Sequence, residues 1–380
     1  MSQTTIPQSD PHASYLHHHA AILDAIIRTL DSGHLILGPQ TAHFEEEFSA
    51  FLGVGETIGV GNGTDALNIA LRACGIRPGD AVITVSQTAV ATIAGIQLAN
   101  AVPVLADIDP QSFTMSSENL NTAIRDYLDS PESEQNPLKA VVVVHLYGHP
   151  ADLPGISEIC DRHHLVLIED CAQAHGATYN TRPVGTWGRA AAFSFYPTKN
   201  LGALGDGGAV VTVDPEVAAK ARLLREYGWK DRYTSEIPGL NSRLDELQAA
   251  ILRVRLPHLS TENATRRAIA NDYNEHLRGL PITLPHVDHA VSHVFHQFVI
   301  RAPNRDGLRF HLKEMGINAL VHYPFAVHQQ PAYRGQLFQP KTGLPETERA
   351  TREILSLPMY PQLTEEQVRR IAVGIRSFYT

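Results

Sequence analysis

The chain has 380 residues, of which 43% are hydrophobic and 19% charged, so it can bury a sizeable core and wholesale disorder is excluded. Its formal net charge is -9 without any basic block, which gives nucleic-acid binding no support. No apolar run is long enough for a bilayer, and the N-terminus lacks a charged start and an apolar core. Three cysteines give neither a disulfide framework nor a paired metal motif. We therefore expect a cytoplasmic protein with no metal site, no nucleic acid and no membrane partner.

The first two thirds of the chain alternate between helical and strand patterns. Helices are expected over 20–30 and 41–52, with Gly53 as a C-cap and the histidines of 17–19 on a solvated helix face. Apolar runs of strand length follow, separated by a helix over 89–100 and a polar loop over 129–138. The runs are 57–60, 80–86, 102–108, 139–148 and 164–173. Alternation of this kind predicts a large α/β domain whose sheet is mostly parallel and has helices on both faces.

The pattern changes near residue 255. A polar amphipathic helix is expected over 261–280, then a strand over 293–300, a helix over 307–317 and a strand over 318–324. A final helix opens with the capping-box pattern of Thr364 and Gln367. The sequence therefore predicts a large domain over 1–255 and a small α+β domain over 256–380.

The stretch "GNGTDAL" places two glycines and a threonine between a strand and a helix. Gly63 and Thr64 stand near the helix start, where free N–H groups and the helix dipole favour an anion such as phosphate. The alternative is an ordinary turn with an N-cap threonine. The spacing fits neither the dinucleotide-binding nor the nucleoside-triphosphate-binding glycine pattern.

Two further stretches carry reactive side chains. Asp170 ends an apolar strand in "LVLIEDCAQ", where ligands of open α/β sheets bind, although such a carboxylate can also cap a turn. Lys199 lies in "FSFYPTKNLGALGDGGA" among small and apolar residues, and desolvation there favours the neutral amine that acts as a Schiff-base nucleophile. A surface lysine is the alternative, but Ser194 nearby can offer its hydroxyl to a phosphate. A phosphate cradle, a carboxylate and an amine are together what pyridoxal 5'-phosphate requires.

These motifs, in this order, resemble the DegT/DnrJ/EryC1/StrS family of sugar aminotransferases along nearly the whole chain. The resemblance implies the α/β architecture of fold-type I pyridoxal-phosphate transferases and an obligate homodimer with shared active sites. It implies that Lys199 binds the cofactor covalently and that Asp170 pairs with the pyridine nitrogen. The other cofactor contacts that it implies are Gly63, Thr64, Gln173, Ser194 and, from the neighbouring subunit, Asn241.

The sequence departs from the family pattern at one place. Family members often carry an aromatic residue over the cofactor ring after a threonine, whereas here Thr88 is followed by Ala89. Gln87 is therefore a candidate for covering the ring. The substrate side is expected to include Tyr196, His322, Tyr323 and His328, although the two histidines could equally be surface-loop residues.

Within the family, "REYGWKDRY" and "GLNSRLDELQAAIL" resemble the branch that acts on C-3 of nucleotide-linked 3-keto-6-deoxysugars, with a dTDP-linked sugar as the expected substrate and L-glutamate as the amino donor, released as 2-oxoglutarate. The first alternative is a C-4 keto-sugar aminotransferase, in which "NYRM" more often replaces "NSRL". A sugar dehydratase, which carries histidine in place of the lysine, is disfavoured by Lys199. A non-catalytic pyridoxal-phosphate-binding regulatory protein is the alternative from another class.

Overall fold

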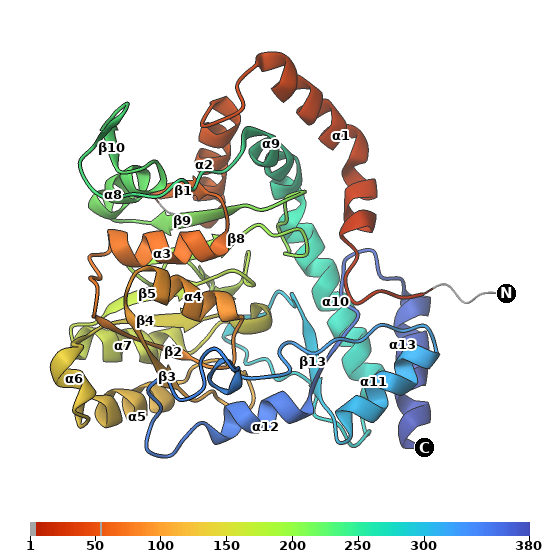
Figure 1. The fold of residues 1–380 in the computed structure, drawn as a ribbon. Coiled ribbons are helices and arrows are strands. Elements are labelled where there is room, and N and C mark those ends of the chain that lie inside the picture. Colours follow the sequence, from red (N-terminus) through yellow and green to blue (C-terminus); the bar gives the residue numbers. More distant parts are fainter. Residues whose placement is uncertain (1–4, 54) are drawn as a thin grey trace.

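A seven-stranded sheet forms the centre of the larger part of the molecule (Figure 1). The structure is a computed structural model that describes residues 5–53 and 55–380. Among the described strands of this sheet only β9 runs opposite to the others, which confirms the mostly parallel arrangement. The order across the sheet is β1 (Glu56–Val60), β9 (Gly208–Thr212), β8 (Ala190–Ser194), β5 (Val166–Asp170), β4 (Leu138–Val144), β2 (Ala81–Val85) and β3 (Val102–Ala106).

Helices cover both faces of the sheet, as the alternating pattern predicted. Because successive side chains of a strand point to opposite faces, Val142 packs with one helical layer while Val141 and Val143 pack with the other. The first layer consists of α3 (Gly63–Ala73), α4 (Val90–Leu98) and α8 (Pro215–Arg225). The second consists of α2 (Pro39–Leu52), α5 (Ser117–Leu128), α7 (Leu153–Arg162) and α9 (Glu246–Arg255).

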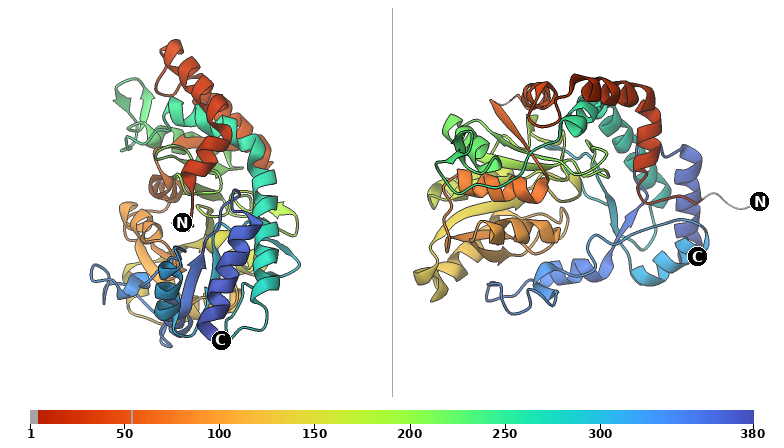
Figure 2. Two further views of the ribbon diagram at one scale, coloured as in Figure 1. Left: turned by 90° about the vertical axis from the view of Figure 1, so that its right-hand side faces the viewer. Right: turned by 45° about the horizontal axis from the view of Figure 1, so that its top comes forward.

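The smaller part of the molecule has its own core around a two-stranded antiparallel sheet. Helix α10 leads into it from α9 and packs beside α13, as both views in Figure 2 show. The capping box of Thr364 and Gln367 at the start of α13 is present as predicted. The elements of the smaller part are α10 (Leu259–Leu277), β13 (Phe298–Arg301), α11 (Arg305–Glu314), α12 (Pro345–Glu353), β14 (Ile354–Leu357) and α13 (Glu365–Tyr379).

The remaining elements are peripheral. Helix α1 (Pro11–Ser32) packs against α9, and Gly53 caps α2 with a φ of 68° as expected. None of the described helices has the length and the apolar character that crossing a membrane requires. The short elements are α6 (Glu132–Gln135), β6 (Thr178–Tyr179), β7 (Arg182–Pro183), β10 (Trp229–Asp231), β11 (Thr234–Ser235), β12 (Val291–Ser292) and the 3-10 turns Leu146–Gly148, Leu256–His258 and Val327–Gln329.

Contacts cross the proposed domain boundary at residue 255 in both directions. Near the N-terminus, Ile6 donates its N–H to the Gly316 carbonyl at 2.9 Å and accepts from the Asn318 N–H at 2.9 Å, and its side chain is buried in the small core. In the other direction, the Thr347 N–H of α12 donates to Asp107 Oδ1 of the large part at 2.8 Å. The division into 1–255 and 256–380 stays a proposal. The segment around Ile6 packs with the small part and α12 contacts the large part, so the contacts do not divide strictly at residue 255.

Three local predictions were wrong. The strand expected over 318–324 is absent apart from a single bridge between Leu320 and Ser356 of β14, because the adjacent residues Ile317 and Asn318 pair with Ile6 instead. The loop over 129–138 contains the short helix α6. In the histidine run, His18 is not solvated: it is buried, stacks on His258, and its Nε2 lies 3.1 Å from Glu262 Oε1.

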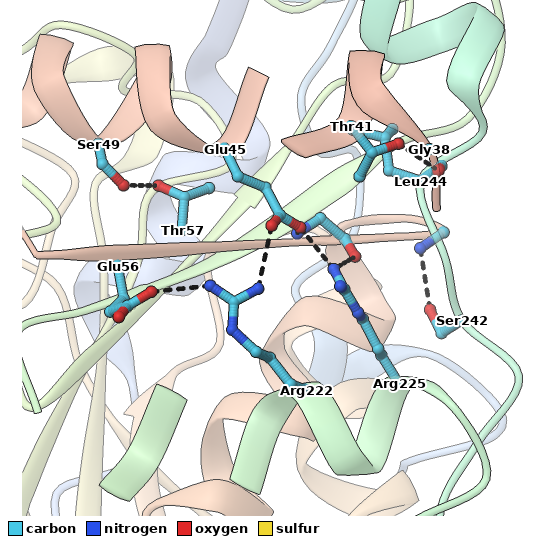
Figure 3. A network of polar contacts seen from close by, with 12 residues as sticks. Gly38, Thr41, Glu45, Ser49, Glu56, Thr57, Arg222, Arg225, Ser242 and Leu244 are labelled. Carbon is cyan, nitrogen blue, oxygen red and sulfur yellow. Dashed lines mark hydrogen bonds and ion pairs between the residues drawn. The ribbon is translucent and has the colours of Figure 1, made fainter. Parts of the chain in front are cut away.

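A polar network joins α8 to α2 and the first strand (Figure 3). The Glu45 carboxylate on α2 accepts from the Gly59 N–H at 2.8 Å and from Arg222 Nη1 at 3.0 Å, and it also pairs with Arg225. Arg225 is buried and donates in addition to the Gly59 carbonyl at 3.0 Å. The network therefore fixes β1 just before the glycine-rich turn of 61–64.

Candidate active site

The cavity that holds most of the predicted site residues lies at the carboxyl ends of β5 and β8, beside the N-terminal ends of α3 and α4. It has a volume of about 630 Å³, and residues of the small part close one side of it. Nine of the predicted residues line it: Gly63, Thr64, Asp170, Gln173, Ser194, Tyr196, Lys199, His322 and Tyr323. The sheet thus brings together side chains that are far apart in the sequence.

Lys199 supplies an amine with altered basicity. Its side chain is half-buried, but protein atoms crowd the amine, and this desolvation lowers the pKa to about 8, with the Asp170 carboxylate raising it in part. The Lys199 N–H donates to the Tyr196 carbonyl at 2.8 Å, so a turn fixes the backbone from which the side chain enters the cavity. A substantial share of the amine is therefore neutral near pH 8 and can act as a nucleophile.

Asp170 is the buried carboxylate of the cavity. Its Oδ2 accepts from the Thr92 hydroxyl at 2.8 Å, and its Oδ1 accepts from the Ala172 N–H at 3.1 Å. Both oxygens thus have a protein donor, which fixes the plane of the group.

The turn before α3 forms an anion cradle. Asn62 caps the helix by accepting from the Asp65 N–H at 2.9 Å, whereas the N–H groups of Gly63 and Thr64 have no partner among the described residues. A Cβ added to Gly63 would lie 2.6 Å from Ser194 Cβ, so only glycine lets the helix start approach Ser194 this closely. Two free N–H groups, a helix dipole and neighbouring hydroxyls suit a phosphate.

Ser242 ties this cradle to the "GLNSR" segment. Its hydroxyl donates to Asp65 Oδ2 at 2.7 Å. It also accepts from the Gly61 N–H at 2.9 Å, the contact drawn at Ser242 in Figure 3. The preceding residue, Asn241, is exposed and lies outside this chain's cavity lining. The structure therefore holds Asn241 at the surface on a support that is itself fixed to the cradle.

The wall that faces Asp170 consists of Gln173, Tyr147 and residues of the small part. Gln173 Oε1 accepts from the Tyr147 N–H at 2.7 Å, and Gln173 Nε2 donates to the Tyr323 hydroxyl at 3.2 Å. His322 Nδ1 lies 2.9 Å from the Ser356 hydroxyl, and burial lowers the pKa of His322 to about 4, with the Lys199 charge acting in the same direction. His322 is therefore neutral at physiological pH and offers hydrogen bonds rather than charge.

Three predicted residues lie elsewhere. Gln87 is fully buried beside the cavity wall, where its Nε2 donates to the Tyr147 hydroxyl at 3.2 Å; it does not line the cavity. His328 is buried outside the lining, with Nδ1 2.7 Å from the Ser86 hydroxyl and Nε2 3.3 Å from Glu348 Oε1. Asn241 is exposed, as noted above.

Sequence reasoning missed several residues of the lining. Thr88 and Thr92 contact Asp170 directly or through each other, and their spacing of four at the start of a helix was the available signal. His296 and Gln297 come from the small part, and nothing in their local pattern distinguishes them from core residues.

His145, which lines the cavity, brings a ligand atom of the metal-binding type together with those of the fully buried Glu169 and Cys171. The Glu169 carboxylate, however, accepts from the N–H groups of Gly185, Trp187 and Gly188 at 2.7 to 2.8 Å, and its Oε2 lies 3.1 Å from His145 Nε2. This fully buried carboxylate thus holds the loop that leads into β8 and serves packing.

Comparisons with known proteins agree with this site. The chain is 44% identical over 374 residues to the dTDP-3-amino-3,4,6-trideoxy-alpha-D-glucose transaminase of Streptomyces venezuelae, covering 98% of this chain and 96% of that protein. It is 45% identical over 362 residues to the pleiotropic regulatory protein of Geobacillus stearothermophilus, covering 94% of this chain and 93% of that protein.

Among solved structures, DesV of S. venezuelae, crystallised in complex with a ketimine intermediate, superposes with a TM-score of 0.93 at 44% identity and covers 99% of both chains. The solved relatives include further aminotransferases of the same architecture, which confirms the fold-type I prediction. The model of the DegT/DnrJ/EryC1/StrS aminotransferase family matches residues 17–376. The chain belongs to the DegT/DnrJ/EryC1/StrS aminotransferase family.

Proposed function

We propose that this aminotransferase binds pyridoxal 5'-phosphate and transfers the amino group of L-glutamate to C-3 of a dTDP-linked 3-keto-6-deoxyhexose. The observation that carries the proposal is the meeting of a pKa-lowered amine, a doubly hydrogen-bonded carboxylate and an anion cradle in one cavity.

The residues present fit this cofactor. The close contact between Gly63 and Ser194 leaves the free N–H groups at the start of α3 for a phosphate, and Asp170 offers an anion to a protonated ring nitrogen. Lys199 lines the same cavity and would hold the aldehyde carbon. When bound, the cofactor supplies an electron sink for the charge that develops as the donor loses its Cα proton.

The side chains of the chain divide the remaining work. Once released from the cofactor, the Lys199 amine would take the proton from the donor's Cα and deliver it to the cofactor. A pKa of about 8 suits an amine that has to both accept and release a proton. Asp170 would stabilise positive charge on the ring nitrogen through its fixed carboxylate. Gln173 and Tyr323, which are hydrogen-bonded to each other, would contact the ring and exclude water from it.

The choice of C-3 rests on the "NSRL" sequence at 241–244 and on the named activity of the S. venezuelae relative. We propose that Tyr196, His322 and Tyr323, which line the cavity, contact the sugar nucleotide, whereas His328 lies outside the lining with Nδ1 2.7 Å from the Ser86 hydroxyl. The second candidate, amination at C-4 by the same residues, is separated by product analysis: the position of the new amine in the product decides between them.

We further propose a homodimer in which each site receives Asn241 from the partner. Asn241 is exposed and lies outside its own cavity, on a segment fixed to the cradle by Ser242. The exposed apolar side chains on and after α1 supply a surface for a second copy; they are Leu16, Leu23, Ile27, Leu30, Leu35 and Ile36. A cytoplasmic location stays a prediction.

The first experiment is an absorbance spectrum of the purified protein with pyridoxal phosphate, before and after L-glutamate. We expect a visible band that L-glutamate converts to the pyridoxamine form. Lys199→Ala is expected to lose the band and turnover, whereas Lys313→Ala, at an exposed position on α11, keeps both. A wild-type protein without the band would refute the proposal.

The regulatory alternative makes a different prediction from the same protein. A bound cofactor that neither L-glutamate nor any dTDP- or UDP-linked 3- or 4-keto sugar discharges would favour the non-catalytic alternative, and the G. stearothermophilus relative is named as a regulatory protein.

A further inference from the structure

Two threonines at the start of α4 form a hydrogen-bonded chain to Asp170. The Thr88 and Thr92 hydroxyl oxygens are 2.7 Å apart, and the Thr92 hydroxyl lies 2.8 Å from Asp170 Oδ2. Both threonines are almost fully buried, with 2% and 1% exposure, yet both line the cavity. The hydrogen-bonded chain from Thr88 through Thr92 to Asp170 is therefore shielded from bulk water.

The direction of the chain follows from its end. An ionised carboxylate can only accept, so the single hydroxyl proton of Thr92 points to Asp170. The Thr92 oxygen must then accept the proton of Thr88, which makes Thr88 the first donor. Each donation polarises the next hydroxyl, so the bond that reaches Asp170 is stronger than an isolated one.

We propose that Thr88 and Thr92 are positioning residues that aim the Asp170 carboxylate, and thereby set how strongly it attracts the proton of the cofactor's ring nitrogen. The proposal rests on the proposed function. Asp170 Oδ1 accepts from the Ala172 N–H, and Oδ2 accepts from Thr92. The hydrogen-bonded pair of Thr88 and Thr92, called the relay below, thus supplies one of the two donors that fix the carboxylate plane. Without it, Oδ2 loses its protein donor, and the carboxylate is free to turn and to accept more fully from the ring N–H.

Other ionisable groups also face Asp170. The Lys199 amine, the Tyr323 hydroxyl and the Cys171 thiol interact with its charge from three separate segments. The pKa of Tyr323 is raised to about 12, mainly by burial, and burial raises that of Cys171 further, so both stay neutral over the range of the test. In the proposed holoenzyme Lys199 is bound to the cofactor. The relay is therefore the influence on Asp170 that the variants below change.

The test is a pH titration of the visible absorbance of the cofactor-loaded protein. In Thr92→Val, which keeps the shape of the side chain, Asp170 draws the ring proton toward itself and the ring withdraws less electron density. The proton at the Lys199 linkage is then held more tightly, and we expect the midpoint to rise by about one pH unit. Thr92→Ser restores the hydroxyl and is expected to restore the wild-type midpoint.

Thr84→Val is the matched control. Thr84 is fully buried on β2, and its hydroxyl has no partner among the described residues, so the substitution removes a buried hydroxyl without touching the relay. We expect an unchanged midpoint. An unmoved midpoint in Thr92→Val, or equal shifts in Thr92→Val and Thr92→Ser, would overturn the proposal.

Thr88→Val keeps the test decisive if Thr92→Val does not fold. It removes the first donor only, so a smaller rise in the same direction is expected, with reversal in Thr88→Ser; no rise would overturn the relay. A wild-type protein that shows no visible band contradicts the proposed function itself, which separates that failure from a failure of the relay.

Discussion

At the scale of single residues, Lys199 owes its chemistry to its surroundings. Crowding by protein atoms lowers the pKa of its amine to about 8, while Asp170 limits the fall. The neutral, reactive form increases as the pH rises through that value. For the cofactor-free protein, we expect the rate of Lys199 modification by an amine reagent, measured against Lys199→Met, to reach half its maximum near pH 8.

The matched variant is Asp170→Asn. It removes the charge that favours the protonated amine, so the half-maximal rate is expected at a lower pH than in the wild type. A midpoint near the ordinary lysine value of 10.5 in the wild type would show that the amine is not desolvated.

The sequence predicted the reactive residues because their local patterns are unusual. A lysine among glycines, a carboxylate at the end of an apolar strand and a glycine-rich helix start can each be recognised without a structure, and the cavity contains all three. Thr92 could not be found in this way, because a threonine near a helix start is common and only the tertiary contact with Asp170 gives it a role. Gln87 was misjudged for the converse reason: its neighbours in sequence line the cavity, but its own side chain turns into the core.

At the scale of elements, α2 carries two glutamates whose ion pairs differ in burial. Glu45 is buried and pairs with the buried Arg225, whereas Glu47 pairs with Arg253 at 2.7 Å with both side chains partly in solvent. Glu45→Ala leaves Arg225 unpaired, so we expect it to lower the free energy of unfolding by about 3 kcal/mol. Denaturant unfolding measures this loss.

Glu47→Ala, on the same helix, is the control. A solvent-exposed pair contributes little, so a loss below about 1 kcal/mol is expected. Equal losses in the two variants would mean that burial of the Glu45 network adds nothing to stability.

Elements were predictable where periodicity was strong. The buried strands of the sheet and the amphipathic helices α3 and α13 follow the sequence closely. The segment 318–324 was not, because its apolar residues suit a strand as well as a loop, and its neighbour Ile317 and its first residue Asn318 pair with the distant Ile6. Whether such a segment forms a strand depends on pairing with distant segments, and the local sequence pattern carries no information about that pairing.

At the scale of the whole molecule, shared sites make a quantitative prediction. If Lys199 and Asn241 of one site come from different subunits, a heterodimer of Lys199→Ala and Asn241→Ala has one intact site and one doubly defective site. After subunit exchange in an equal mixture, half of the dimers are heterodimers, so about a quarter of the wild-type activity is expected. Activity that stays at the mean of the two inactive parents would contradict sharing.

The pairing of Ile6 with Gly316 and Asn318, together with the bond from the Met359 N–H to the Gln8 carbonyl at 3.0 Å, has a consequence for biosynthesis. Ile6 and Gln8 have to wait for partners that are synthesised more than 300 residues later, roughly 20 to 70 s at typical elongation rates. The large sheet, whose last strand in the chain ends at Thr212, can assemble in the meantime. The small core is therefore completed only after these later partners have been made, and until then its apolar surface stays exposed.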